Sequence, residues 1–522
     1  MNKALQNVLF YHQETKHSQQ RYARSLGYMD WATQPDAFRN YEPTKKIMLP
    51  LSENNPMPPY SLLDASLPNA PLLKESLSQL LQFSLGIAAW KVSGGSSWAV
   101  RCNASSGNLH PTESYVVLPP VFQEQNNKST IFHYAPKNHA LEILAEFETS
   151  FWEHLEKGSF LLGLSSIVWR EVWKYGERAF RYTQLDVGHA WQALVVSAKL
   201  LGWKITKLDT IAHSDMTKIM GLDQKQRFFE NEIADMLLLV SPTQTETKLS
   251  LDILLQDLPK SYQGQANKLS HSMQDWKIID TIEQATSQDH QAQTKVEKCK
   301  VSRKPSANAK DIILNRRSIH VMDKEQSFIT QEQFHILLQS VAGSLDGNEN
   351  ATHLVLFVHR VQTYEQGLYL LLRNEKEKEL LKGLMHSTFT WENTPFKHLY
   401  ILEKNNFQLQ SKIISCNQAI ASDGAFSLGM LCNYTQELHD YGAQRYKELY
   451  WECGAIGQQL YLEATSLGLS GTGIGCFLDD MMHDILGLSS KHFQILYHFT
   501  VGRGYVDSRI QTRPAYSKPR VV

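Results

Sequence analysis

The sequence predicts a protein of mixed helices and strands that contains two related copies of one domain. Short apolar runs, such as residues 115–118 and 236–240, have the length of buried strands and are far too short to span a bilayer. Residues 186–222 align without a gap with residues 452–488, so one segment occurs twice. A polar stretch between the copies separates the chain into two large parts.

The repeated segment predicts the same elements in both copies. Gly188 falls on Gly454 and Asp186 on Glu452, and apolar residues of the second copy recur at helical spacing along one face. We expect a long helix, a loop, and a short helix that ends at Gly-Leu. A chain with two copies of one domain predicts an intramolecular pseudo-dimer, and the sequence leaves further oligomerisation open.

Changes in composition divide the chain. Residues 243–310 are rich in Gln, Ser, Thr, Lys and Asp, which is typical of a solvated linker. The predicted units are an N-terminal extension, 1–70, a first domain, 71–245, a polar linker, 246–308, and a second domain, 309–522.

Composition and charge exclude several classes of protein. The 522 residues are 42% hydrophobic and 20% charged, with a net charge of −1, so no basic stripe favours nucleic acid. The six cysteines form no C-x-x-C pair and no zinc-like spacing, which favours reduced thiols and no metal site. The N-terminus lacks an apolar run of signal-peptide length. We expect a cytoplasmic protein that binds neither nucleic acid nor membrane.

Arginine is distributed unequally between the copies. The second copy opens with Arg316-Arg317-Ser318, whereas the first half has no arginine between Arg39 and Arg101. Two guanidinium groups and a hydroxyl form a natural grip for a phosphate. The alternative, which is the commoner case for such a tripeptide by itself, is a solvated helix end with two surface arginines.

Glycines follow the long helix in the second copy only. Gly471, Gly473 and Gly475 alternate with Thr472 and Ile474, so backbone amides there can approach a planar or anionic ligand. The spacing is not the dinucleotide fingerprint, and it follows a helix where that fingerprint needs a strand. The alternative is an ordinary glycine-rich turn that ends a helix.

Small polar residues precede the strand at 115–118. The loop lacks the G-x-S-x-G pattern of a hydrolase, and its residues resemble a set of hydrogen-bond partners for a polar ligand. The alternative is a structural turn. Nothing in the second copy matches the loop from Asn103 to Pro111, so we expect the second half to lack it. The candidate ligand-binding residues are Ser105, Ser106, Gly107, Asn108 and His110.

Lys174 and Tyr175 are candidates for proton transfer. A lysine becomes a general acid or base near neutral pH if desolvation lowers its pKa. More commonly such a pair is a surface lysine beside a core tyrosine.

Four motifs together resemble the nitroreductase-type FMN flavoproteins. They are Arg-x-Ser at 316–318, Ser-Ser-Gly-Asn at 105–108, Gly-x-Gly-x-Gly at 471–475 and Val-Gly-Arg at 501–503. The loop through Val117 and the Lys-Tyr-Gly-x-Arg stretch from Lys174 are similar to the SagB-type dehydrogenase branch, and residues 11–18 and 30–39 resemble the tandem members of that branch.

The resemblance implies an α+β fold: two nitroreductase-like domains, each a central antiparallel-type sheet flanked by helices, fused as a pseudo-dimer. In that family two subunits share each flavin. Carried over here, one FMN per chain lies between the halves. The second domain supplies Arg316, Arg317, Ser318, His320, Gly471, Thr472, Gly473, Ile474, Gly475 and Arg503, and the first supplies Ser105, Ser106, Gly107, Asn108 and His110. The family commonly has Lys or Arg at the position of His320.

The resemblance implies an FMN-dependent oxidoreductase that transfers two electrons, as hydride, to or from a small organic or peptide-derived substrate. Lys174 and Tyr175 would move the proton. NAD(P)H is the electron donor in a reductase, and O2 the acceptor in an oxidase. Two alternatives stay open: azoline-to-azole dehydrogenation on a modified peptide, and a non-catalytic flavin-binding or storage protein.

Overall fold

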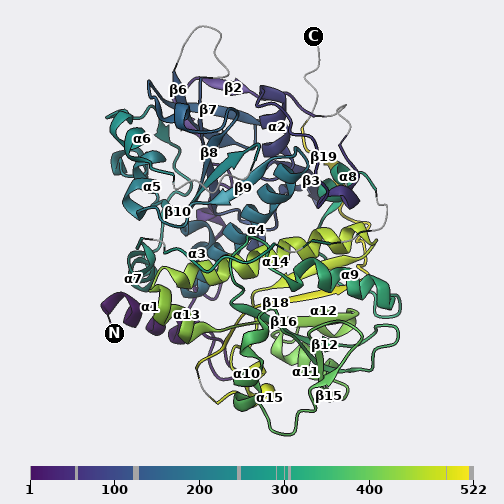
Figure 1. The fold of residues 1–522 in the computed structure, drawn as a ribbon. Coiled ribbons are helices and arrows are strands. Elements are labelled where there is room, and N and C mark those ends of the chain that lie inside the picture. Colours follow the sequence, from purple (N-terminus) through teal and green to yellow (C-terminus); the bar gives the residue numbers. More distant parts are fainter. Residues whose placement is uncertain are drawn as a thin grey trace.

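The computed structural model describes residues 2–52, 57–120, 128–243, 249–289, 291–298, 300–301, 303, 307–489 and 491–516. It confirms the predicted α+β class. Two large antiparallel sheets, one from each half of the chain, lie at opposite ends of the molecule, and helices pack between them (Figure 1). Among these residues no helix is long and apolar enough to cross a bilayer.

The first sheet has seven strands in the order β2-β7-β6-β5-β8-β10-β9. Their bounds are β2 Lys46–Met48, β5 Thr112–Leu118, β6 Ser129–Ala135, β7 Ala140–Phe147, β8 Phe160–Ser166, β9 Lys204–Lys207 and β10 Ile233–Ser241. β5 is buried on both faces: Val116 and Leu118 pack in one apolar cluster, Tyr115 and Val117 in another. This explains its continuous apolar run.

The second sheet repeats this order as β14-β15-β13-β12-β16-β18-β17. Its strands are β12 Thr352–Val358, β13 Gly367–Leu371, β14 Glu392–Asn393, β15 Leu399–Lys404, β16 Phe426–Cys432, β17 Ser470–Ile474 and β18 Gln494–Gly502. The registers also agree, because Thr112 pairs with Ser166 in one sheet and Thr352 with Cys432 in the other. The two halves are therefore structural copies.

Two small sheets connect distant parts of the chain. β1 (Tyr41–Glu42) pairs with β11 (Gln265–Ala266). β3 (Ile87–Ser93) pairs with β4 (Ser96–Arg101) and with β19 (Gln511–Pro514). The C-terminal strand β19 thus crosses from the second half to the first, where it lies beside β3 (Figure 1).

Fifteen helices are present among the described residues, and the repeated segment supplies the longest two. They are α1 Lys3–Glu14, α2 Lys74–Gln82, α3 Trp169–Tyr175, α4 Ala179–Lys199, α5 His213–Ile219, α6 Asp252–Asp257, α7 Lys277–Thr286, α8 Ala309–Asn315, α9 Gln331–Ala342, α10 Lys378–Leu384, α11 Gln408–Ile414, α12 Ile420–Asp423, α13 Tyr434–Tyr441, α14 Arg445–Ser466 and α15 Met481–Leu486. The predicted long helices α4 and α14, and the short helices α5 and α15, are confirmed.

The two halves meet where α4 crosses α14 at the centre of the molecule (Figure 1). A Cβ built on Gly188 would lie 2.9 Å from the Gly454 Cα, and one on Gly454 would lie 2.9 Å from the Gly188 Cα. Each glycine is the other's counterpart in the repeat, so an approximate twofold axis passes between them. The absence of side chains at both positions permits this close approach.

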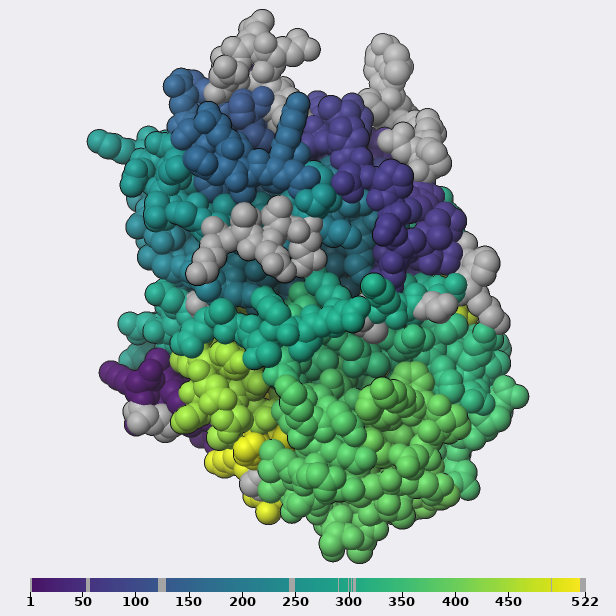
Figure 2. All heavy atoms as spheres, in the orientation of Figure 1, coloured from purple at the N-terminus to yellow at the C-terminus, as the bar shows by residue number. Residues whose placement is uncertain are grey.

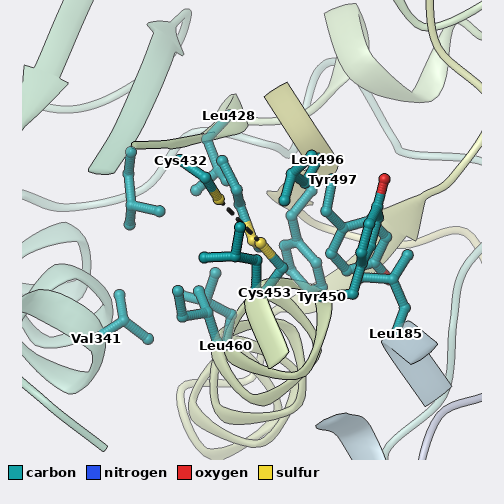
Figure 3. Close-up of a cluster of buried hydrophobic side chains, with 14 of the residues drawn as sticks. Leu185, Val341, Leu428, Cys432, Tyr450, Cys453, Leu460, Leu496 and Tyr497 are labelled. Atoms are coloured by element: carbon teal, nitrogen blue, oxygen red, sulfur yellow. Dashed lines mark hydrogen bonds between the residues drawn. The ribbon is translucent and has the colours of Figure 1, made fainter. Parts of the chain in front are cut away.

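The core of the second half includes a buried pair of thiols. Cys432 of β16 and Cys453 of α14 lie 3.7 Å apart between their Sγ atoms, and both are 0% exposed. Leu428, Leu460 and Tyr450 surround them (Figure 3). Their environment is mainly apolar, and the Thr352 hydroxyl lies 3.2 Å from the Cys432 Sγ.

The segment at 246–308 is not the solvated linker that its composition predicts. It contains α6, β11 and α7, and α7 buries Ile279, Ile282 and Ala285. In Figure 2 the teal residues of this segment lie across the boundary between the halves. Sparse apolar residues therefore suffice here, because those of α7 pack into an apolar cluster of the core.

Candidate functional site

The predicted ligand-binding loop of the first half is a tight 3-10 turn over Ser106–Asn108. Gly107 has a φ of 56°, and a Cβ there would lie 2.6 Å from the Tyr175 Oη and 3.1 Å from the Lys174 Nζ. Both the backbone conformation and the space therefore require glycine. The turn places the candidate proton-transfer pair directly against the candidate binding loop.

Hydrogen bonds within the loop fix its polar side chains. Ser105 Oγ accepts from the His110 N–H at 2.8 Å, and Asn108 Nδ2 donates to the Ala99 carbonyl at 2.8 Å. His110 is 3% exposed, and its Nδ1 has no hydrogen-bond partner among the described residues. Burial holds the pKa of His110 well below its ordinary value. His110 is thus a neutral ring with one free nitrogen.

The glycines at 471–475 lie mainly in a strand, which corrects the expectation of a turn. β17 covers Ser470–Ile474 and pairs with β18, at the edge of the second sheet. Gly473 N–H donates to the Tyr461 Oη at 2.8 Å, and a Cβ on Gly473 would overlap the Tyr497 Oη. As the edge strand, β17 has backbone groups that face away from its neighbour.

Arg316 and Arg317 are the two predicted phosphate ligands. Arg316 is buried and crosses to the first half, where its Nε and Nη2 donate to the carbonyls of Cys102 at 3.1 Å and Arg101 at 2.9 Å. Arg317 Nη1 donates to the Leu314 and Arg316 carbonyls. Neither forms an ion pair with a described carboxylate. Burial lowers the pKa of both, that of Arg317 to about 10 with further repulsion from Arg316.

The remaining predicted residues of the second half lie beside β17. Ser318 pairs with Gly471 through a backbone bridge, and its Oγ is 2.7 Å from the Tyr461 Oη. His320 and Arg503 are exposed. The Arg503 carbonyl accepts from the Asp323 N–H at 2.7 Å, which places Arg503 next to the 318–323 segment.

A series of contacts between polar side chains crosses the interface and links the loop of the first half with the predicted residues of the second half. Tyr461 contacts His189 of α4, with ring centroids 5.9 Å apart. His189 Nδ1 lies 3.3 Å from the Gln458 Oε1, and that oxygen accepts from the Ala104 N–H at 3.1 Å. The structure therefore brings the loop at 105–110 and the 316–318 and 471–475 segments together across α4 and α14. We call these three segments the first interface site.

Two buried acids beneath the loop are absent from the sequence prediction. Asp186 accepts from the Ser106 N–H at 2.9 Å and from its hydroxyl at 2.9 Å, and burial raises the Asp186 pKa to about 7. Glu171 is 0% exposed, and neither carboxyl oxygen has a partner among the described residues. Burial raises the Glu171 pKa well above its ordinary value. Only the alignment of Asp186 with Glu452 indicated either one.

Lys174 and Tyr175 differ in their surroundings. Lys174 is exposed, whereas Tyr175 is half-buried and packs edge-on against Tyr182. Burial, and then the proximity of Glu171, raises the Tyr175 pKa well above its ordinary value. Tyr175 therefore keeps its proton. The desolvation invoked for Lys174 does not occur in this structure.

The pseudo-symmetric counterpart of this site has a different chemistry. Residues 343–351 precede β12 as residues 103–111 precede β5, and Asp346-Gly347-Asn348 stands where the first half has Ser106-Gly107-Asn108. Gly347, like Gly107, has a positive φ, of 91°. The expectation that the second half lacks this loop was therefore wrong. We call residues 343–351 with 204–209 the second interface region.

Charged side chains fill the second interface region. Lys207 occupies the position that corresponds to Gly473, and its Nζ lies 3.3 Å from the Asp209 carboxylate. Arg373 pairs with Glu452 at 2.5 Å, and Arg445 with Glu448 at 3.1 Å. Five of these paired residues also line a pocket at this position, together with neutral side chains such as Trp191 and Trp451.

Residues of the 291–298 segment cover the second interface region. Gln293 Nε2 donates to Glu448 at 2.9 Å, and Lys295 Nζ contacts Asp209 at 2.5 Å and Asn348 at 2.7 Å. No group of three or more metal-ligating side chains occurs among the described residues, here or at the first interface site.

Comparison with known proteins identifies the second half. Residues 313–503 match the Nitroreductase family, and this range includes Arg316, Ser318, β17 and Arg503. Residues 313–503 are a nitroreductase-family domain. A solved structure assigned as a nitroreductase from Anabaena variabilis extends the fold to both halves. It has a TM-score of 0.71 at 19% identity and covers 96% of this chain and 99% of its own.

Two curated relatives match shorter segments. The trifolitoxin-processing protein TfxB of Rhizobium leguminosarum bv. trifolii is 26% identical over 171 residues, which is 30% of this chain and 45% of TfxB. The assigned nitroreductase MJ1384 of Methanocaldococcus jannaschii is 35% identical over 71 residues, 14% of this chain and 34% of that protein. The chain thus spans less than half the length of either relative.

Proposed function

We propose that this protein is an FMN-dependent oxidoreductase with one flavin per chain, bound at the first interface site. The observation that carries the proposal is a pair of arginines, Arg316 and Arg317, which share a partly desolvated site and have no described carboxylate partner. Charges of this kind are costly unless an anion compensates them. A phosphate between Arg316, Arg317 and the Ser318 hydroxyl would supply that compensation.

The remaining predicted residues of the first interface site lie where they would contact the planar ring of a flavin. On the outer edge of β17 the Gly473 N–H donates to the Tyr461 hydroxyl and Gly471 bridges Ser318, so a planar polar ring would exchange with these contacts or bind beside Gly475. Ser105, Ser106 and Asn108 offer hydroxyl and amide groups from the opposite half. Bound FMN would supply two-electron transfer through its ring. Tyr175 keeps its proton and lies against Gly107, so it is placed to donate a hydrogen bond or a proton to a substrate at the loop.

The second interface region supports the single flavin. Lys207 occupies the position where β17 has Gly473, and its charge is paired with acids rather than offered to a ligand. The first half also lacks arginine from residue 40 to residue 100. We therefore propose that this region binds no flavin.

For the substrate we favour a modified peptide, as in the SagB-type branch. The relation to TfxB, a trifolitoxin-processing protein, supports this choice. Reduction of a small nitro or quinone compound with NAD(P)H is the competing activity. A flavin protein without turnover is the third candidate, and the exposed His320 in place of a permanent cation favours it.

The decisive experiment is flavin quantification on the purified full chain, with Arg316→Ala and the exposed Arg509→Ala as matched variants. We expect about one FMN per chain in the parent and in Arg509→Ala. Arg316→Ala should weaken FMN binding by about 10–100-fold, the value of one charge-assisted contact. Two flavins per chain, or none after FMN is added, would overturn the single shared site.

Consumption of NADH or of O2 then separates an enzyme from a flavin-binding protein. Turnover of a small acceptor with NADH supports the reductase. Oxygen consumption that requires an azoline-containing peptide supports the dehydrogenase. An FMN-loaded chain that is inactive in both assays supports the binding protein.

A further inference from the structure

A second pair of thiols lies at the end of the glycine strand. Cys476 directly follows Gly475, and Cys416 lies in the connection between α11 and α12. Their Sγ atoms are 2.8 Å apart, both residues are partly exposed, and both are free thiols. A disulfide bond has an S–S distance of about 2.05 Å. The two sulfur atoms therefore have to approach by less than about 1 Å to bond.

The surrounding backbone holds these thiols together. Cys416 and Asn417 have φ values of 53° and 61°, a conformation that non-glycine residues rarely adopt. Gln418 Nε2 donates to the Cys476 carbonyl at 3.2 Å and to the Ser415 carbonyl at 2.9 Å. The connection is thus fixed against the residue that carries the second thiol.

The two thiols differ in acidity. The hydrogen bond from Cys476 lowers the Cys416 pKa, and the same contact raises the Cys476 pKa. Tyr22 also hydrogen-bonds to Cys416, which raises the Tyr22 pKa to about 12. The thiolate is the reactive form of cysteine, so Cys416 is the attacking group and Cys476 the resolving one.

We infer that Cys416 and Cys476 form a redox-active dithiol that exchanges with small disulfides of the glutathione class. The Cys416 thiolate attacks one sulfur of the small disulfide and displaces one small thiolate. The Cys476 thiol then loses its proton and attacks the Cys416 sulfur, which releases the second small thiol. The two protein thiols lose two electrons and two protons, and the small disulfide gains both.

Formation of the disulfide would restrain the backbone at the first interface site. The Gly475 carbonyl accepts from the Tyr182 hydroxyl at 3.1 Å and from Arg178 at 3.3 Å, and both donors belong to the first half. Oxidation would tie the residue after Gly475 to the α11–α12 connection. The exchange itself does not require flavin, so its test is independent of the proposed function.

The chain contains its own control pair. Cys432 and Cys453 lie 3.7 Å apart but are 0% exposed in the core (Figure 3). Burial raises the Cys453 pKa well above its ordinary value. A small disulfide reaches neither sulfur while the protein is folded, so this pair should stay reduced. Cys299 lies outside the described residues, and peptide mapping separates it from both pairs.

The test incubates the native full chain with reduced and oxidised glutathione in stepped ratios. The reaction is then quenched with acid, the free thiols are labelled after denaturation, and the cysteine peptides are mapped by mass spectrometry. We expect the Cys416 and Cys476 labels to disappear together, a linked peptide to form, and dithiothreitol to restore both. Cys432 and Cys453 should keep their labels throughout.

Single variants test the order of attack. In Cys476→Ser, Cys416 should retain glutathione as a stable mixed disulfide, because the resolving thiol is gone. In Cys416→Ser, Cys476 should react at least about tenfold more slowly. The inference is overturned if the parent protein gives no linked peptide, or if the buried pair oxidises at the same glutathione ratio.

Discussion

At the first interface site β17 carries Gly473, whose N–H donates to the Tyr461 hydroxyl and whose lack of a side chain leaves room for the Tyr497 hydroxyl. At the equivalent position of the second interface region β9 carries Lys207, whose charge faces Asp209 and Asp346. The two sheets have the same strand order, and both loops have a glycine with positive φ. The backbone frame is therefore shared, and the side chains decide what each region can bind.

The acid beneath each loop shows the same divergence. Asp186 lies under the first loop without a cation partner and accepts hydrogen bonds from Ser106. Its counterpart Glu452 forms an ion pair with Arg373 at 2.5 Å. In the second interface region the charged side chains are thus compensated by other charged groups of the protein. The first keeps an unpaired acid in one half and unpaired arginines in the other, an arrangement suited to a polar ligand with an anionic end.

The largest effect on FMN content is expected from a substitution that makes the first interface site resemble the second interface region. Gly473→Lys adds a side chain that overlaps the Tyr497 hydroxyl and places a cation where the proposed flavin ring lies. We expect FMN per chain to fall from about one to near zero. Gly383→Lys is the matched control, because Gly383 is exposed in α10 with open space around its Cβ position. Full FMN content in Gly473→Lys would contradict the placement of the flavin.

The reverse change makes the second interface region resemble the first, and it should affect the stability of the protein. Lys207→Met removes the cation from the second interface region and leaves the half-buried Asp346 with less compensation of its charge. The free energy of unfolding should fall by about 3 kcal/mol, the lower end for a broken buried pair, since Asp209 keeps Lys295. Denaturant unfolding measures it, and FMN content should not change. Lys204→Met, exposed on the same strand, should shift stability by less than about 0.5 kcal/mol.

Neutralising Asp186 and neutralising its counterpart Glu452 should change the free energy of unfolding in opposite directions. The Asp186 pKa of about 7 exceeds the unfolded value of about 3.9, so the stability present at low pH is lost as pH rises between these values. Asp186→Asn removes this loss. The flavin-free variant should therefore gain about 2–4 kcal/mol over the parent by pH 8 and little at pH 4.

Glu452→Gln is the matched change in the other region. It leaves Arg373, which is buried, without its carboxylate, and should cost about 1–3 kcal/mol at pH 8. Urea unfolding at pH 4, 6 and 8 compares the two variants. Equal effects of the two changes would mean that the regions do not differ electrostatically as described.

The smallest effect is expected at Tyr175. The contact that Tyr175 makes with Gly107 has no equivalent at Gly347 in the second interface region. Tyr175→Phe removes the hydroxyl beside Gly107 and keeps the ring packed on Tyr182. We expect kcat/KM to fall about tenfold, roughly 1.4 kcal/mol, because water and the exposed Lys174 can also deliver a proton. FMN content should stay at the parent value. A loss of flavin instead would assign Tyr175 to binding.

The repeat carried most of the fold prediction. Helical spacing in residues 186–222 and 452–488 predicted α4, α14, α5 and α15, because a buried helix has to repeat its apolar face every three to four residues. The same reasoning missed β9 and β17, which were expected as a loop and a turn. Edge strands of four or five residues have too little periodicity to be recognised, and glycine favours a turn in any local prediction.

Residue types, combined with the family resemblance, indicated the proposed binding segments at 105–108, 316–318 and 471–475, because arginine pairs and glycine runs have a direct chemical meaning. Sequence could not show that Arg316 donates to carbonyls of the other half, or that Asp186 and Glu171 lie buried beneath the loop. It also could not relate 343–351 to 103–111, where two residues coincide in nine. Only the common position before β5 and β12 shows that correspondence. Burial and pairing depend on contacts between distant segments, and so the tertiary structure alone decided which charges in this chain are satisfied and which remain available to a ligand.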